Sequence, residues 1–218
     1  MGLIPLPRVG TGVPEEPAFP DPGDATPVAA GCERCPALVD CRTRISHGVG
    51  PTGAAVVVVG EAPGAGAPEA GRWRGGNLTG MAYTTRHSGR AVRRLVADAG
   101  FAGDAYYTNA VKCFPCDGAG SNREPTAAER ANCRPYLREE LATVDPDAIL
   151  TTGKHATATV FAMDDRSVDG FLDLVLEPVE TGVGRVVPLL HPSYQAVWLA
   201  RLDHTRESYL DALRSLLA

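Results

Sequence analysis

The sequence predicts an α/β protein of three layers (α/β/α), in which helices cover both faces of a parallel β-sheet. Two observations lead to this prediction. Short runs rich in apolar and β-branched residues alternate along the chain with segments of helical periodicity. The first run, AAVVVVG at 54–60, is almost continuously apolar, which is typical of a strand buried on both faces of a parallel sheet. Strands that alternate with helices are joined by right-handed crossovers and therefore run in the same direction.

The other elements follow in alternation. A helix is expected at 88–100, where SGRAVRRLVADAG has helical periodicity and a closing glycine. A second helix, at 125–144, opens with a proline, which suits the first turn of a helix. The remaining expected elements are strands at 105–111, 147–153 and 184–193, and helices at 154–163 and 203–217. The pattern thus predicts a sheet of four strands.

Length and composition indicate one globular domain. The chain has 218 residues, of which 44% are hydrophobic and 22% charged, so a sizeable core is within reach. Residues 31–218 are expected to form this domain, whereas residues 1–30 are rich in proline and glycine and are expected to be an extended or disordered arm. No run approaches the roughly 20 apolar residues of a membrane span, and no export signal is evident. We therefore expect a cytoplasmic protein with no membrane partner. We also expect a monomer.

The net charge of −5 provides no basic field over the whole protein. The basic residues are nevertheless unusual, because 19 of the 21 are arginines and only Lys112 and Lys154 are lysines. Arginine makes bidentate contacts to phosphate that lysine does not make. A composition bias of the source explains the excess equally well, so a local basic patch stays an open alternative.

The six cysteines are the first chemical clue. In a reducing compartment a disulfide framework is improbable, and metal ligation is favoured. Cys32 and Cys35 form a C-x2-C pair, Cys113 follows the second strand, and Cys133 lies in the following helix. Four such thiolates suit either a [4Fe–4S] cluster or structural zinc. A site of this kind would tie the amino-terminal segment to the body of the domain and would have a structural role.

A second group of residues follows the predicted strands. In parallel α/β sheets the ligand lies beyond the carboxyl ends of the strands. Residues 60–64, Asn109, Gly153 and His191 all stand at such ends. They are therefore expected to converge on one cleft.

These segments resemble a known family. CERCPALVDCRTR, VVVVGEAPG, YYTNAVKCFP, SNREPTAAERANCRPYL, DAILTTGKHA and LLHPSY occur in the order found in the iron–sulfur uracil-DNA glycosylases, the family 4 and family 5 branches of their superfamily. The similarity covers roughly residues 32–195. It implies a four-stranded parallel sheet of order 2-1-3-4 between helices. It also implies hydrolysis of the N-glycosidic bond of uracil in DNA, which leaves an abasic site for base excision repair.

The resemblance also assigns the cysteines. Cys32, Cys35, Cys113 and Cys133 match the ligands of the family's [4Fe–4S] cluster, and zinc remains the alternative. Cys41 stands where the family has no ligand, and we interpret it as a spare small apolar or surface residue. The CDGAGS stretch lengthens the segment before residue 122 and brings in an extra cysteine, Cys116. Cys116 is therefore either a second spare or a replacement for Cys113.

By the same resemblance, three side chains carry the chemistry of the cleft. Asn109 matches the amide that reads the base, because its donor and acceptor suit N3–H and O4 of uracil. His191 matches the histidine that stabilises charge at uracil O2, and Glu61 matches the acidic residue of family 4 that positions water or stabilises the sugar cation. Further contacts to the base or phosphate are expected from Gly60, Ala62, Pro63, Gly64 and Ser193. Purely structural roles, as caps and turns, are the alternatives.

The aromatic position of the cleft departs from family 4. Counted back from residues 88–89, Tyr83 stands where family 5 has its stacking ring, and Trp73 is the competing ring. After the HPSY motif, Trp198 or Leu199 is expected to enter the vacated base stack, with Arg201 on phosphate; an ordinary helix core face is the alternative. A phosphate-binding face is expected from Arg72, Arg74, Arg86, Arg90, Arg93 and Arg94, and for the last three a solvated helix face is the alternative.

Three other functions stay open. In the first, the same fold acts on other deaminated bases, such as hypoxanthine or xanthine. In another, the chain is a non-catalytic DNA-binding protein held together by its metal site, for which residues 61, 109 and 191 are dispensable. An iron–sulfur electron carrier is the third.

Overall fold

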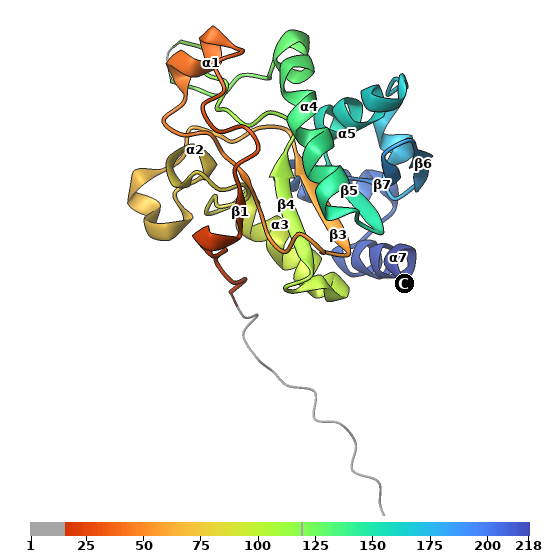
Figure 1. The fold of residues 1–218 in the computed structure, drawn as a ribbon. Coiled ribbons are helices and arrows are strands. Elements are labelled where there is room, and N and C mark those ends of the chain that lie inside the picture. The colour runs from red at the N-terminus through yellow and green to blue at the C-terminus, as the bar shows by residue number, and fades with distance from the viewer. Residues whose placement is uncertain (1–15, 119) are drawn as a thin grey trace, which may run out of the picture.

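The computed structural model describes residues 16–118 and 120–218. Its centre is a parallel sheet made of the four predicted strands (Figure 1). These are β3 (Val56–Gly60), β4 (Ala105–Asn109), β5 (Ala148–Thr152) and β7 (Gly184–Leu189). β3 pairs in parallel with β4 and with β5, and β5 pairs in parallel with β7. In chain order the central strands are therefore arranged 2-1-3-4, as the resemblance implies.

The sheet has seven strands rather than four, in the order β1-β2-β4-β3-β5-β7-β6. The three additional strands are antiparallel and lie at the two edges. They are β1 (Ala25–Thr26), β2 (Gly48–Val49) and β6 (Val179–Thr181). At two or three residues each, they are too short to produce the alternation by which strands are found in a sequence.

The long helices begin and end close to the expected positions. The helices are α1 (Pro36–Cys41), α2 (Gly76–Thr79), α3 (Ser88–Val96), α4 (Ala127–Val144), α5 (Lys154–Phe161), α6 (Gln195–Trp198) and α7 (Arg206–Leu217). Thr126 and Glu129 form a capping box at the start of α4, which explains why this helix starts two residues after the expected proline. α3 passes into a π-helical turn at Ala97–Phe101, where Gly100 has a positive φ of 106°.

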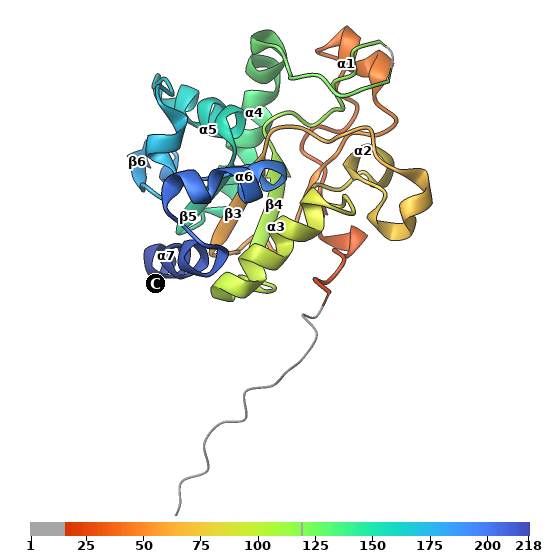
Figure 2. The same ribbon diagram turned by 180° about the vertical axis from the view of Figure 1, so that it is seen from behind.

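Alternate residues of β3 explain the three layers. Val56 and Val58 belong to the apolar cluster under α3 and α7, whereas Val57 and Val59 belong to the cluster under α4 and α5. All four side chains are at most 1% exposed, and full burial of each contributes about 1.5–3 kcal/mol. Figures 1 and 2 show the two helical layers from opposite sides of the sheet.

The described part of the expected arm lies against the domain. β1 pairs with β2, Ala29 is buried, and the ring of Phe19 meets that of Trp73 edge to face with the centroids 5.0 Å apart. Residues 1–15, the remainder of that expected arm, lie outside the described residues.

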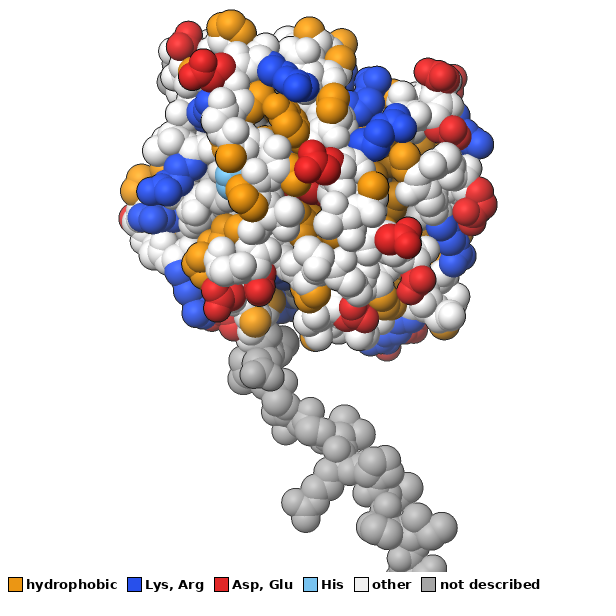
Figure 3. Space-filling model, in the orientation of Figure 1, with side chains coloured by type: hydrophobic (Ala, Val, Ile, Leu, Met, Phe, Trp, Pro, Cys, Tyr) orange, Lys and Arg blue, Asp and Glu red, His pale blue; other side chains and the backbone are white. Residues whose placement is uncertain are grey.

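The surface mixes both charges. Acidic and basic side chains are interspersed on the face drawn in Figure 3, in keeping with the net charge of −5. Among the helices of the described residues, none combines the length and apolar character that crossing a membrane requires.

Candidate active site

A cavity of about 560 Å³ lies at the carboxyl ends of the central strands. Eight of the nine residues predicted for catalysis and substrate binding line it. They are Gly60, Glu61, Ala62, Pro63, Gly64, Tyr83, Asn109 and His191. The exposed side chain of Ser193 lies instead in a neighbouring groove. The expected convergence of strand ends on one cleft is therefore what the structure shows.

Asn109 ends β4 inside this cavity and is only 5% exposed. Its side chain is packed against Gly60, where a Cβ atom would lie 2.5 Å from Asn109 Oδ1 and 2.8 Å from the Tyr83 hydroxyl. No real Cβ tolerates these separations, so residue 60 has to be glycine for the amide and the phenol to approach each other. The backbone carbonyl of Asn109 accepts a hydrogen bond of 2.8 Å from Lys112 Nζ, which fixes the end of the strand from behind.

Tyr83 is held in a strained backbone conformation with φ 53°. Nε of Arg93 donates to the carbonyl of Tyr83 at 3.0 Å, and Nη2 donates to the carbonyl of Ala82 at 3.2 Å. The Tyr83 hydroxyl hydrogen-bonds to Oγ1 of Thr152 at 2.6 Å, and burial raises its pKa, so the phenol stays neutral. A left-handed backbone at a bulky residue costs of order 1–3 kcal/mol and persists only where the surroundings impose it. Arg93 supplies that constraint here.

Arg93 is therefore not part of a phosphate-binding face, as one of the two sequence interpretations had it, nor is it solvated. It is buried, with its guanidinium 3.9 Å from the centroid of the Tyr107 ring. Burial lowers its pKa to about 10, which still leaves it charged at neutral pH.

The two other aromatic predictions have different outcomes. Trp73 is only 5% exposed, packs against Phe19 and is not among the residues that line the cavity, so it does not compete with Tyr83. Trp198 lines the cavity half-buried, with the guanidinium of Arg201 4.6 Å from its ring centroid. Leu199 packs on the core, whereas the side chain of Val197 in α6 is 60% exposed.

His191 precedes the 3₁₀ turn Pro192–Tyr194 and caps it. Its Nδ1 accepts a hydrogen bond of 3.3 Å from the backbone N–H of Ser193. Burial lowers the pKa of the imidazole, which keeps it neutral at physiological pH. A neutral ring whose Nδ1 is an acceptor carries its proton on Nε2. His191 thus presents a hydrogen-bond donor, and Ser193 contributes through its backbone by fixing this tautomer.

Glu61 lies in a small group of ionisable residues at the cavity. Burial, to which the nearby Glu124 carboxylate adds, raises the pKa of Glu61, and His155 opposes the shift. His155 Nε2 lies 3.1 Å from Glu124 Oε1. Both residues line the cavity, and both were missed from the sequence, although they stand within the quoted SNREPT and TTGKHA segments.

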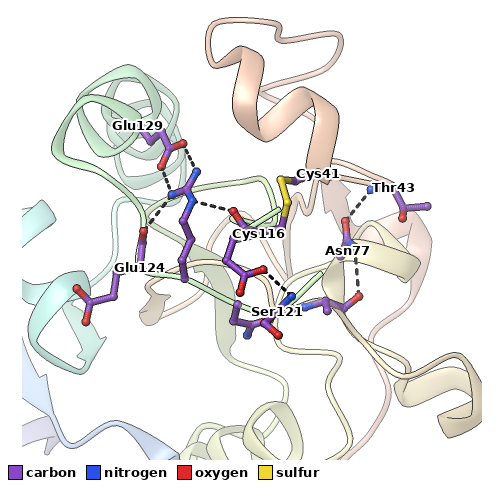
Figure 4. Close-up of a disulfide and its surroundings, with 11 residues drawn as sticks. Cys41, Thr43, Asn77, Cys116, Ser121, Glu124 and Glu129 are labelled. Carbon is purple, nitrogen blue, oxygen red and sulfur yellow. Dashed lines mark hydrogen bonds and ion pairs between the residues drawn. A yellow bond between two sulfur atoms is a disulfide. The ribbon is translucent and has the colours of Figure 1, made fainter. Parts of the chain in front are cut away.

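The segment at 122–124 shapes the loop that follows Glu61. Oδ1 of Asn122 accepts a hydrogen bond of 3.1 Å from the backbone of Ala65. Arg123 forms a two-pronged ion pair with Glu129, at 2.7 and 2.6 Å, and so attaches this segment to the first turn of α4 (Figure 4). A further missed side chain is Phe171, which lines the cavity from a short 3₁₀ turn, Phe171–Leu174, in a stretch where no element was expected.

The four predicted ligand cysteines are free thiols that approach one another. Cys113 and Cys133 are buried in one small apolar cluster, and Cys35 packs against them. Burial raises the pKa of the Cys133 thiol to about 11, and the neighbouring Cys113 and Cys35 add to the shift. No three His, Cys, Asp or Glu side chains of the described residues are grouped tightly enough to hold a single ion.

Each of these sulfurs faces a hydrogen-bond donor. Cys113 Sγ accepts from Arg42 Nη1 at 3.2 Å, and Cys35 Sγ accepts from Asn132 Nδ2 at 3.3 Å. The backbone N–H of Lys112 donates to Cys133 at 3.4 Å, and the Tyr136 hydroxyl is hydrogen-bonded to Cys32. Donors around all four sulfurs suit thiolates, which carry negative charge, and hydrogen bonds to sulfur are a normal feature of iron–sulfur ligation.

Cys41 and Cys116 are joined in a disulfide, with their Cα atoms 5.6 Å apart (Figure 4). The expectation that both are spare residues, and that disulfides are improbable, is wrong for this pair. Cys116 is therefore not free to replace Cys113 as a ligand. The two partners are 75 residues apart, and connectivity over such a separation is not readable from cysteine spacing.

Fold and site together define a class: a three-layer α/β protein whose cavity offers a buried amide, a neutral histidine donor and a carboxylate. Residues 47–216 match the uracil-DNA glycosylase superfamily. The chain belongs to this superfamily, as its motifs suggested.

Three relatives are similar over much of their length. The Type-4 uracil-DNA glycosylase of Thermotoga maritima is 33% identical over 164 residues, which cover 75% of this chain and 77% of the relative. The Type-5 uracil-DNA glycosylase of Pyrobaculum aerophilum is 31% identical over 216 residues, or 86% and 88% of the two chains. The Type-4 uracil-DNA glycosylase of the same organism is 37% identical over 122 residues, or 56% and 55%. Similarity to both types agrees with the mixture of family 4 and family 5 features at residues 61 and 83.

Proposed function

We propose that this protein hydrolyses the N-glycosidic bond of uracil in DNA, releasing free uracil and leaving an abasic site for base excision repair. The observation that carries the proposal is the meeting of Asn109 and His191 in one cavity, with the tautomer of His191 fixed by the backbone N–H of Ser193. A base inside a duplex is inaccessible, so the nucleotide has to leave the stack and enter this cavity. The relatives' names support uracil as the base.

We propose a role for each side chain of the cavity. Cleavage leaves negative charge on uracil, and the Nε2–H of His191 stabilises that charge at O2 as a fixed dipole. Asn109 pairs with N3–H and O4, and cytosine would leave these buried groups unpaired. Glu61, with its raised pKa, positions the attacking water and accepts its proton. The ring of Tyr83 stacks on the base, a contact worth about 1–3 kcal/mol.

Single-turnover assays on oligonucleotides with one uracil, hypoxanthine or xanthine test this function. We expect release of free uracil and slower or no release of the other two bases. A preference for hypoxanthine or xanthine would assign the fold to other deaminated bases. Equal binding of uracil-containing and normal DNA without release of any base would identify a non-catalytic DNA-binding protein. The partner is uracil-containing DNA, and we expect a monomer that acts in the cytoplasm.

We also propose that Cys32, Cys35, Cys113 and Cys133 hold a [4Fe–4S] cluster. The donors around their sulfurs support this assignment. The cluster would cross-link the amino-terminal segment, the end of β4 and α4. None of these four cysteines is among the residues that line the cavity, so the cluster would have a structural role and would supply no group to the reaction.

The cysteines make this assignment testable. Cys113→Ser is expected to abolish the visible absorption and the iron content of the purified protein and to lower its melting temperature. The matched control is the double variant Cys41→Ser/Cys116→Ser, which removes the disulfide and leaves the four ligands in place. It should keep iron and colour. Zinc in a colourless wild-type protein, or full iron in Cys113→Ser, would contradict the cluster.

A further inference from the structure

A second groove, of about 400 Å³, adjoins the cavity. The two share Ser88 and Pro192 in their linings, so the groove begins at the rim of the cavity. The cationic residues Arg86, Arg90 and Arg94 line it together with His87, and no acidic residue of the described chain does. The groove is thus a local concentration of positive charge on a protein of net charge −5.

The side chains are arranged along one helix. Arg90 and Arg94 are one turn apart on the same face of α3, and Arg86 comes just before the helix begins. Arg93, on the next face, turns inward to Tyr83, so the helix separates a structural arginine from those in the groove. Nε of Arg94 is buried and has no hydrogen-bond partner among the described residues. Such a group is costly unless a ligand satisfies it.

We propose that this groove binds the backbone phosphates of the DNA strand that flanks the nucleotide in the cavity, which rests on the function proposed above. Guanidinium groups pair with phosphate oxygens in a two-pronged geometry and do so without regard to base sequence. Because the groove starts at the rim of the cavity, its guanidinium groups lie where the DNA strand has to pass when one nucleotide has turned into the cavity.

The protein itself supplies a competitor for the groove. Glu16 Oε1 lies 3.2 Å from Arg90 Nη2, with both side chains partly exposed. The segment that carries Glu16 is anchored by the contact of Phe19 with Trp73, and the Arg90 guanidinium lies 5.7 Å from the Trp73 ring centroid. A phosphate that binds Arg90 therefore displaces a carboxylate, so removal of that carboxylate should favour DNA.

The test measures binding of a uracil-free single-stranded oligonucleotide by fluorescence anisotropy at several salt concentrations. Arg90→Ala/Arg94→Ala is expected to weaken binding about tenfold at low salt and to reduce the slope of log K against log salt by about 1.4, at about 0.7 per lost contact. Glu16→Gln should tighten binding about two- to fivefold, the range of an exposed ion pair. The control, Arg138→Ala/Arg185→Ala, removes the same charge from α4 and β7.

Equal salt slopes for the wild type, the groove variant and the control would overturn the proposal, as would a control slope that falls as much as that of the groove variant. If the double variant folds poorly, Arg86→Ala provides the same comparison, because Arg86 lies outside α3. This variant is expected to change the salt slope by about 0.7. Because this oligonucleotide contains no uracil, the outcome is independent of excision. A protein that releases no uracil but shows these slopes would refute the proposed function, while the phosphate-binding role of the groove would still hold.

Discussion

Replacing His191 with alanine should lower the single-turnover rate of uracil release by about 10²–10³-fold, the usual cost of losing one donor to a developing oxyanion. The N–H of Ser193 donates to Nδ1, so the ring proton lies on Nε2, and alanine has no such donor. Because the charge on uracil O2 develops only in the transition state, the rate should change far more than the affinity for the substrate. The measurement is the release of uracil from a saturated complex.

His191→Gln is the matched variant, because its amide restores a donor of similar reach without a titrating ring. It should recover part of the lost rate. In the wild type, the His191 ring should stay neutral even at the ordinary imidazole value of pH 6.5, because burial lowers its pKa. The rate should therefore fall only at more acidic pH, where protonation displaces Ser193 N–H from Nδ1. A His191→Ala protein that retains a tenth or more of the wild-type rate would remove His191 from the chemistry.

The central fold was predictable because its strands are buried on both faces. Val56, Val57, Val58 and Val59 form a continuous apolar run, since neighbouring residues enter different helical layers. The cavity followed from the rule for parallel sheets, which places Gly60, Asn109 and His191 together whatever the intervening chain does.

Other features depend on contacts between distant residues, and these leave no local pattern. Nothing near Cys41 in the sequence points to Cys116, and the inward turn of Arg93 depends on the backbone of Tyr83. The two residues of β1 pair only because β2 is already at the sheet edge. Tertiary geometry decides each of these, and local propensity does not.

Glu140→Ala should lower the free energy of unfolding by about 3–5 kcal/mol, because it leaves a buried ammonium group without its counter-charge. Glu140 is fully buried in α4 and forms an ion pair with Lys112 Nζ, which is 1% exposed. The carboxylate also accepts hydrogen bonds from Tyr106 Oη at 3.1 Å and from Thr108 Oγ1 at 2.8 Å. Urea unfolding of the cluster-loaded protein measures the loss.

The neighbouring Glu139 is the matched control, because it lies on the same helix with its side chain exposed. Glu139→Ala should change the stability by no more than about 0.5 kcal/mol. Glu140→Leu/Lys112→Met replaces both charges with apolar groups and should be less destabilising than Glu140→Ala alone, since no charge is left unpaired. A loss below about 1 kcal/mol in Glu140→Ala would mean that water reaches Lys112.

The position of this ion pair links the two halves of the site. Lys112 Nζ holds the carbonyl of Asn109, while the backbone N–H of Lys112 donates to Cys133. One residue thus contacts both the strand end that presents the base-reading amide and a predicted cluster ligand. Glu140→Ala should therefore also reduce uracil release and iron retention together, whereas Glu139→Ala should change neither. If Glu140→Ala lost stability but its folded fraction kept full activity and full iron, Lys112 would stabilise the core and have no role at the site.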